Sequence, residues 1–326
     1  MWKKLSLLIL SALLVGGVSI QPALGQKYPT KPIELYLPYG PGGGYDLISR
    51  AVAKMAPKYL EQPIVVVNKP GGGGSIAAAD VISSKPDGYK LMFTTSGFFA
   101  LTTKTQKVPF DPNHLVPLAC FCKNKGVMVV RNDSPWKTVD DVLDYARKNP
   151  GKLTWAHSGR GIAEHIWALL LFRKAGVKTI DVPYPAGEPE KIPALLGGHV
   201  DVAFSSGSGI KGHLKAGTIR VLVAMSDRRY EDLPNVPCTQ ELGFTESAKI
   251  AVVGGWFAHK DTPDDIKKTL IDALKKVYED PELKKIVDDI GEQPFFGGPE
   301  LIYEKIKYTE ELGVPILKEL GLYVEK

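Results

Sequence analysis

Short apolar runs alternate with amphipathic stretches along most of this chain. Residues 33–39 and 64–67 have the profile of buried strands, and apolar positions at helical spacing fill 46–60 between them. Further strands are expected at 91–94, 153–156, 179–182, 200–204 and 220–224. Repeated strand–helix–strand units predict an α/β fold with mostly parallel sheets and helices on both faces. In such sheets, ligands bind in the loops beyond the carboxyl ends of the strands.

Two helix starts carry capping signals. Thr138 and Asp141 form an Asp variant of the capping box, ahead of a helix that Asn-Pro-Gly at 149–151 ends. Thr262 and Pro263 predict a cap and a first-turn proline for a later helix.

Residues 1–25 have the features of a signal peptide. A basic start at Lys3 and Lys4 precedes an apolar, uncharged stretch over 5–20. A transmembrane anchor is the alternative, because this stretch is close to the length that a bilayer needs. Two adjacent glycines interrupt the stretch and small residues follow it, which favours cleavage near Gly25. We therefore expect an exported, periplasmic protein.

The composition fits a globular protein of two domains. The chain has 326 residues, 44% of them hydrophobic and 24% charged, which is too apolar for disorder and too mixed for an integral membrane protein. The formal charge of +5 falls to +3 once Lys3 and Lys4 are removed with the signal peptide. The sequence contains no run of five like charges, so a nucleic-acid partner is not expected.

The three cysteines suggest neither a disulfide nor a metal site. Cys120 and Cys122 are two residues apart on an expected strand, where side chains share a face and seldom meet disulfide geometry. Cys238 stands alone, and no histidine cluster accompanies the pair at metal spacing, so we expect no metal and no cofactor. Small buried hydrophobic side chains are the favoured interpretation.

Three glycine-rich segments, at 38–46, 68–75 and 158–163, link strands to helices. Glycine lets backbone N–H groups converge, and a helix N-terminus adds partial positive charge, so each segment could hold an anion. For any one of them, a tight turn that binds nothing is the alternative. No nucleotide-binding glycine pattern occurs, so three such loops favour a cleft for another anionic ligand.

The sequence contains no recognisable catalytic set. Residues 204–209 approach Gly-x-Ser-x-Gly but lack its first glycine. An exported hydrolase that uses Ser205, Ser206 or Ser208 with His157 or His165 stays open as an alternative. An exported α/β protein with anion-cradling loops is better explained as a binding protein, and we expect no enzyme activity.

Several motifs follow one another along the chain. The most specific are Pro-Gly-Gly-Gly-x-Asp at 41–46 and Lys-Pro-Asp-Gly-Tyr at 85–89. The others are Tyr-Pro-Thr-Lys-Pro-Ile at 28–33, Val-Asn-Lys-Pro-Gly at 67–71, Val-Pro-Tyr at 182–184, Gly-Gly-His-Val-Asp at 197–201 and Leu-Pro-Asn-Val-Pro at 233–237. Together they resemble the substrate-binding proteins of tripartite tricarboxylate transporters, the TctC-like family, also called Bug receptors.

The resemblance implies a type II periplasmic binding-protein fold, in which crossover hinge strands join two α/β lobes around a ligand cleft. The first lobe is expected at 26–126 plus 249–326, and the second at 127–248. Such receptors close on a small carboxylate and deliver it to a two-subunit membrane permease driven by an ion gradient, and we expect a monomer. A receptor that presents the carboxylate to a sensor kinase would use the same closure and is the alternative.

The resemblance also implies the ligand contacts, which in the family are mainly backbone amides and waters of strand–helix loops. First-lobe contacts are expected from Tyr39, Gly40, Gly42, Gly43, Gly44, Asp46, Ser96, Gly97 and Phe98. Second-lobe contacts are expected from Ser158, Gly159, Arg160, Gly161, Ala163, His165, Tyr184, Ala186, Ser205 and Ser206. We expect Asp46 to cap the helix after its loop, a role compatible with orienting bound water or a substrate amine.

Departures from the family pattern bear on the ligand. Ile162 and Ala163 replace the usual loop hydroxyls, and we hypothesise that Arg160 compensates by contacting a carboxylate; a solvated loop arginine is the alternative. Ser205 stands where the family often has Asp, which disfavours an amino-acid ligand. The phenylalanines at 98–99, unless they pack in the core, suggest a pocket for an aromatic or aliphatic mono- or dicarboxylate.

Overall fold

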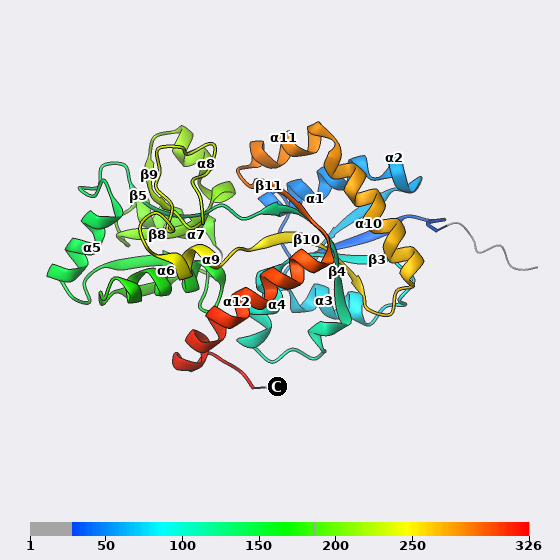
Figure 1. Ribbon diagram of the computed structural model, residues 1–326, viewed down its shortest axis with the longest axis horizontal. Coiled ribbons are helices and arrows are strands. Elements are labelled where there is room, and N and C mark those ends of the chain that lie inside the picture. Colours follow the sequence, from blue (N-terminus) through cyan, green and yellow to red (C-terminus); the bar gives the residue numbers. More distant parts are fainter. Residues whose placement is uncertain (1–27, 186, 326) are drawn as a thin grey trace, which may run out of the picture.

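A computed structural model describes residues 28–185 and 187–325; the expected signal peptide lies outside the described residues. The chain forms two α/β lobes side by side, each built around its own sheet (Figure 1). This confirms the two-lobed α/β fold expected from the sequence. Among the described residues, no helix is both long and apolar enough to cross a membrane.

The first lobe contains a six-stranded sheet in the order β11-β4-β10-β3-β1-β2. Its strands are β1 (Ile33–Leu37), β2 (Ile64–Asn68), β3 (Lys90–Thr95), β4 (Leu115–Lys123), β10 (Val253–His259) and β11 (Gln293–Gly297). One face packs on α1 (Gly44–Met55), α2 (Pro57–Leu60), α10 (Asp264–Glu279) and α11 (Pro281–Ile290). The other face packs on α3 (Ser75–Ile82), α4 (Ser96–Ala100) and α12 (Pro299–Glu319). Three short turns of 3₁₀ helix also occur, η1 (Gly72–Gly74), η2 (Thr102–Lys104) and η3 (Pro112–His114).

The second lobe contains a five-stranded sheet in the order β7-β6-β8-β5-β9. Its strands are β5 (Gly126–Arg131), β6 (Thr154–His157), β7 (Ile180–Pro183), β8 (Val202–Ser206) and β9 (Ile219–Ala224). Its helices are α5 (Val139–Lys148), α6 (Ala163–Lys174), α7 (Glu188–Leu196), α8 (Gly207–Lys215) and α9 (Thr245–Lys249).

Both sheets are mixed. β1 pairs parallel with β2 and β3, and β6 pairs parallel with β7 and β8, as strand–helix–strand units require. β10 runs antiparallel to β3 and β4, and β5 runs antiparallel to β8 and β9. The antiparallel pairs involve the strands that flank the two crossings between lobes, from β4 to β5 and from β9 to β10. The lobe boundaries expected after residues 126 and 248 stay predictions.

One of the two predicted helix starts is correct. Thr138 Oγ1 accepts from Asp141 N at 3.2 Å, and Asp141 Oδ2 accepts from Thr138 N at 2.9 Å, so the capping box before α5 is confirmed. The prediction for the later helix is wrong by one residue. Pro263 is itself the N-cap of α10, with extended backbone, and the helix begins at Asp264.

The cysteines are free and buried, as expected, but two of them do not share a face. A β-bulge in the pairing of β4 with β10 sets Cys120 opposite Gly255 and Cys122 opposite Gly254. The extra residue turns the strand, so Cys120 packs on the α3, α4 and α12 side and Cys122 on the α1 and α10 side. The sequence argument against a disulfide assumed an unbroken strand, whereas the bulge separates the two thiols across the sheet.

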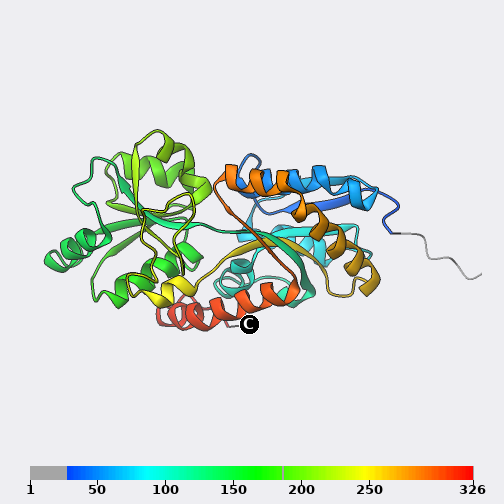
Figure 2. The same cartoon turned by 45° about the horizontal axis from the view of Figure 1, so that its top comes forward.

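The C-terminal helix α12 lies along both lobes (Figure 2). Near its start, Ile302 belongs to the buried cluster on the first sheet, with Phe257. Near its end, Ile316 and Leu317 belong to the core of the second lobe, with Trp167. Residues expected to belong to the first lobe therefore complete the core of the second, so α12 ties the two lobes together.

Replacing Leu317 with alanine should destabilise the whole protein. The side chain is fully buried in the second-lobe core, and truncating a buried leucine costs about 2–5 kcal/mol. Urea unfolding of Leu317→Ala measures this loss. Leu320→Ala, three residues further along and 40% exposed, is the matched control and should change the free energy of unfolding by less than about 0.5 kcal/mol. Equal effects of the two variants would contradict the role given to α12.

Candidate ligand-binding site

A cavity of about 360 Å³ lies between the lobes. It is lined by Pro38, Tyr39, Tyr45, Gly73, Thr95, Gly97, Phe98, Thr102, Asn124, Ile162, Ala163, Glu164, Trp167 and Val252. The loop after β1, the helix α4 that follows β3, the start of α6 and the crossing segments at residues 124 and 252 bring these side chains together. Most of the lining is aromatic or aliphatic, which is typical of a small-molecule site with a few polar groups.

Four residues expected to bind the ligand, Tyr39, Gly97, Phe98 and Ala163, line this cavity. The others that the structure describes lie outside the lining: Gly40, Gly42, Gly43, Gly44, Asp46, Ser96, Ser158, Gly159, Arg160, Gly161, His165, Tyr184, Ser205 and Ser206. Ala186 is outside the described residues. Direct ligand contact by these other residues stays a prediction.

Several lining residues were not among those expected. Asn124 lies in the two-residue segment between β4 and β5, where no motif marks it. Trp167 follows Ala163 by four residues on α6, so helical spacing could have found it. Phe98 lines the cavity and also packs in the first-lobe core, whereas Phe99 packs in that core and does not line this cavity.

The glycine loop between β6 and α6 bonds to its own side chains. Gly159 N donates to His157 Nδ1 at 3.1 Å. Gly161 N, with a left-handed φ of +79°, donates to His165 Nδ1 at 3.2 Å. These two backbone N–H groups therefore donate to histidine side chains of the protein itself. They are not free to bind an anion, as the sequence had suggested for this loop.

The first turn of α6 is the part of this segment that reaches the cavity. Its N-cap residue, Ile162, provides no capping side chain, and Ala163 and Glu164 line the cavity. The first-turn N–H groups of a helix lack intrahelical partners and carry partial positive charge. Because no side chain caps them, they are suited to a carboxylate on the ligand.

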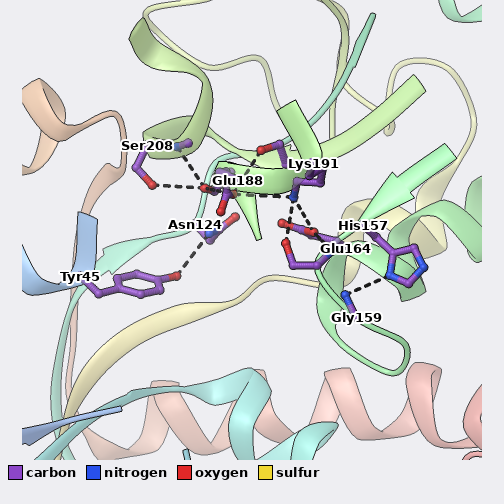
Figure 3. A network of polar contacts seen from close by, with 12 residues as sticks. Tyr45, Asn124, His157, Gly159, Glu164, Glu188, Lys191 and Ser208 are labelled. Atoms are coloured by element: carbon purple, nitrogen blue, oxygen red, sulfur yellow. Dashed lines mark hydrogen bonds and ion pairs between the residues drawn. The ribbon is translucent and has the colours of Figure 1, made fainter. Parts of the chain in front are cut away.

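A buried lysine fixes this turn. Lys191, on α7, is fully buried, and its Nζ donates to Ser158 Oγ at 2.9 Å and to Glu164 Oε2 at 2.8 Å (Figure 3). Ser158 N donates to the same Glu164 oxygen at 2.8 Å. Glu188 Oε1 lies 3.7 Å from Lys191 Nζ. A buried ammonium group has to be paired, so Lys191 holds the loop and the helix start together.

The loop before α1 is fixed in a similar way by Asp46. This buried carboxylate accepts from Gly42 N at 2.9 Å, from Arg50 Nε at 2.9 Å and from Asn68 Nδ2 at 2.8 Å. Burial disfavours its charged form, but the bonds from Arg50, Gly42 and Asn68 outweigh burial and lower its pKa. The N-cap of α1 is Gly43, so Asp46 stabilises the loop from the first turn and is not the cap residue that was expected.

Arg160 is not among the residues that line the cavity. Its guanidinium donates to Asp181 through Nε at 2.8 Å and through a terminal nitrogen at 3.3 Å. Its side chain is 55% exposed. Asp181 lies on β7, so the alternative of a solvated loop arginine fits this position better than contact with a ligand.

His157, His165 and Asp181 are close enough together to be considered as a metal site. In each histidine, Nδ1 accepts a backbone N–H, so the neutral ring carries its proton on Nε2, the atom nearer Asp181. A metal ion would need that nitrogen free of its proton. Burial, followed by repulsion from His157, lowers the pKa of His165 to about 4, which keeps the ring neutral. The arrangement fits a hydrogen-bonded cluster and does not fit a metal.

The serine hydroxyls suggested for a hydrolase are hydrogen-bonded to a glutamate and not to a histidine. Ser205 Oγ and Ser206 Oγ donate to Glu188 Oε1 at 3.2 and 3.1 Å. His157 and His165 lie beside Asp181 instead. A hydrolase needs its nucleophile within hydrogen-bond reach of a base, and the bonds of these described side chains do not form such a pair.

Two polar side chains lie at the segment that crosses from β4 to β5. Asn124 Nδ2 donates to Tyr45 Oη at 3.2 Å, while the buried Asn124 Oδ1 has no partner (Figure 3). Glu292, between α11 and β11, is buried where the lobes meet. Its Oε1 accepts from Ser208 Oγ of the second lobe at 2.6 Å, and its Oε2 accepts from Lys125 N at 3.2 Å. Burial raises the pKa of Glu292 to about 7 despite these bonds.

Two lobes, two strand crossings and a cavity between the lobes define a solute-binding protein of the periplasmic type. The chain belongs to the tripartite tricarboxylate transporter family receptors, TctC, whose family model matches residues 48–322. The family expected from the sequence motifs is therefore confirmed.

Curated relatives cover nearly the whole chain. The UPF0065 protein in gbd 5'region of Cupriavidus necator is 32% identical over 94% of this chain and 93% of its own length. Protein BugT of Bordetella pertussis is 27% identical over 83% of each chain.

Solved structures share the fold. An R. palustris protein with adipate has a TM-score of 0.80 at 25% identity, covering 90% of this chain and 98% of that one. MatC from Rhodopseudomonas palustris with bound malate has a TM-score of 0.72 at 25% identity, covering 87% and 99%. The matched family is one of transporter receptors, which agrees with a binding protein rather than an enzyme.

Replacing Glu292 with glutamine should stabilise the protein more at high pH than at low pH. The folded pKa lies above the unfolded value of 4.5, so the protonated acid favours folding below pH 4.5 and this contribution is lost as the pH rises through 7. Glutamine mimics the protonated acid. The gain in unfolding free energy should therefore be about 2 kcal/mol larger at pH 8 than at pH 5.

Urea unfolding at the two pH values measures this difference. Glu279→Gln, at an exposed position of α10, is the control and should show no such dependence. A gain for Glu292→Gln that is the same at both pH values would contradict the raised pKa.

Proposed function

We propose that this chain is a periplasmic receptor that captures a small carboxylate with an aromatic or aliphatic body and delivers it to a two-subunit membrane permease. The uncapped first turn of α6, set in the wall of an apolar cavity between the lobes, is the observation that carries the proposal. In this proposal, N–H groups of that turn hold the charged end of the ligand. Tyr39, Phe98 and Trp167 surround its body.

Family and neighbours support the proposal. A receptor family of tripartite transporters implies a membrane partner. The two R. palustris neighbours are named with adipate and malate, which are small carboxylates. A cavity of about 360 Å³ lies in the usual size range for such ligands. The proposal includes export with cleavage near Gly25 and action as a monomer.

Filling the cavity at Ala163 should weaken ligand binding while the fold stays intact. Leucine at this first position of α6 would project over the first-turn N–H groups, and overpacking costs about 1–3 kcal/mol. We expect Ala163→Leu to weaken carboxylate binding at least about tenfold in titration calorimetry.

The ligand for this titration is first identified by mass spectrometry of solute released from the purified protein. Ala216→Leu, at an exposed position after α8, is the control and should bind as the parent does. Unchanged affinity in Ala163→Leu, or failure of every carboxylate to bind the parent, would count against the proposal.

Replacing Arg160 with alanine tests whether this residue contacts the ligand. Because the guanidinium is bonded to Asp181 outside the cavity lining, we expect affinity to change by less than about twofold. Loss of a charge-assisted bond to the ligand would instead cost about 1.5–3 kcal/mol, which is roughly tenfold or more. Calorimetry with the same ligand distinguishes the two results.

A further inference from the structure

Helix α8 of the second lobe meets helix α11 of the first. In both views the two helices lie on the opposite side of the crossing strands from α12, which runs along both lobes (Figures 1 and 2). The lobes are thus joined by a continuous helix on one side and by a contact between two helices on the other. A rotation of the lobes about the crossing strands changes the distance between α8 and α11, so this contact bears on opening.

Glycines let the backbones of the two lobes approach closely here. A Cβ on Gly207, the first residue of α8, would lie 2.2 Å from the carbonyl oxygen of Gly291, which follows α11. A Cβ on Gly44, the first residue of α1, would lie 3.0 Å from the Cβ of Ser208. Neither Gly207 nor Gly44 has a left-handed φ, so helix propensity alone would favour alanine at both positions. The close approach of the other lobe is therefore the physical reason for glycine at both.

Hydrogen bonds from the second lobe to the first accompany this glycine contact. Ser208 Oγ donates to Oε1 of the buried Glu292 at 2.6 Å. Lys211 Nζ donates to the carbonyl oxygens of Asp288 and Asp289 at 2.9 and 2.6 Å. These carbonyls belong to the last turn of α11, where a helix carries partial negative charge, so a lysine from the other lobe is favoured there.

A lysine of the crossing segment is paired with both lobes. Lys125 lies between β4 and β5, and its side chain is only 5% exposed. Its Nζ lies 3.1 Å from Asp232 Oδ1 of the second lobe and 3.3 Å from Asp288 Oδ1 of the first. An ammonium group this buried has to stay paired, so the two ion pairs favour the arrangement of the lobes in which both are kept.

We propose that these contacts form a clasp that holds the two lobes together without a ligand. The lobe clasp consists of Gly44, Lys125, Gly207, Ser208, Lys211, Asp232, Asp288, Asp289, Gly291 and Glu292. Each contact joins groups of the protein itself, so none requires a bound solute. The clasp makes the arrangement with α8 against α11 the resting one, whereas a receptor that closes on its ligand would rest with the lobes apart. This goes beyond the proposed function and holds whichever carboxylate is bound.

The distance between two spin labels tests the clasp in protein that has been unfolded, dialysed and refolded to remove any solute. Lys215→Cys on α8 and Lys285→Cys on α11 give exposed label sites on the two lobes, while the native cysteines are buried. Double electron–electron resonance on this labelled parent should show one population, at the short distance that matches α8 against α11.

Gly207→Ala inserts a methyl group between the lobes. Because this group would overlap the carbonyl of Gly291, a longer distance should replace the short one in most molecules. Gly212→Ala, on the same helix with open space around its Cβ, is the matched control and should keep the parent distance. The double variant Ser208→Ala/Lys211→Met removes hydrogen bonds without adding a wedge, and the fraction at the longer distance should rise at least about threefold.

The clasp is overturned if the solute-free parent already shows mainly the longer distance, or if Gly207→Ala and the double variant both keep the parent distribution. The measurement uses no ligand. Failure of every carboxylate to bind would therefore count against the proposed function and leave the clasp standing.

Discussion

The buried ammonium group of Lys191 is the interaction on which the ligand-facing wall of the second lobe depends. It joins α7 to the end of β6 and to the start of α6, through Ser158 Oγ and Glu164 Oε2. A buried ammonium group must keep these partners, so they hold the loop in place before any ligand arrives. A buried charge plays the same part in the first lobe, where the Asp46 carboxylate accepts hydrogen bonds from the backbone of Gly42 and from the side chain of Arg50.

Internal pairing of this kind changes what binding requires. A glycine loop that waits for an anion must be ordered by its ligand, whereas loops already closed by their own carboxylates are ordered in advance, which reduces the entropy cost of binding. The lobes are also closely fitted beside the hinge. A Cβ on Gly207 of the second lobe would lie 2.2 Å from the carbonyl oxygen of Gly291 in the first. Because the loops are already ordered and the lobes are in close contact, the side chains that line the cavity decide which solute fits.

The fold could be predicted because it follows from local patterns. Apolar runs and helical spacing located most strands and helices, and loop motifs such as 41–46 identified the family. The site was only partly predictable. Tyr39, in the loop after β1, and Gly97, in the short helix α4, follow strands at places where the family was expected to bind, and they do line the cavity. Asn124 was missed because the two-residue crossing that contains it has no periodicity and no motif.

Arg160 and Lys191 show why the remaining chemistry could not be predicted. From the sequence, either Arg160 compensates for the lost hydroxyls at Ile162 and Ala163 or it is a solvated loop arginine. In the structure it pairs with Asp181, 21 residues along the chain. The buried cation comes from Lys191, 33 residues from the serine that it bonds. With aliphatic side chains at 162 and 163, this side of the cavity is apolar, and the charge of Lys191 is buried behind it. Such a wall can use backbone N–H groups to hold a carboxylate.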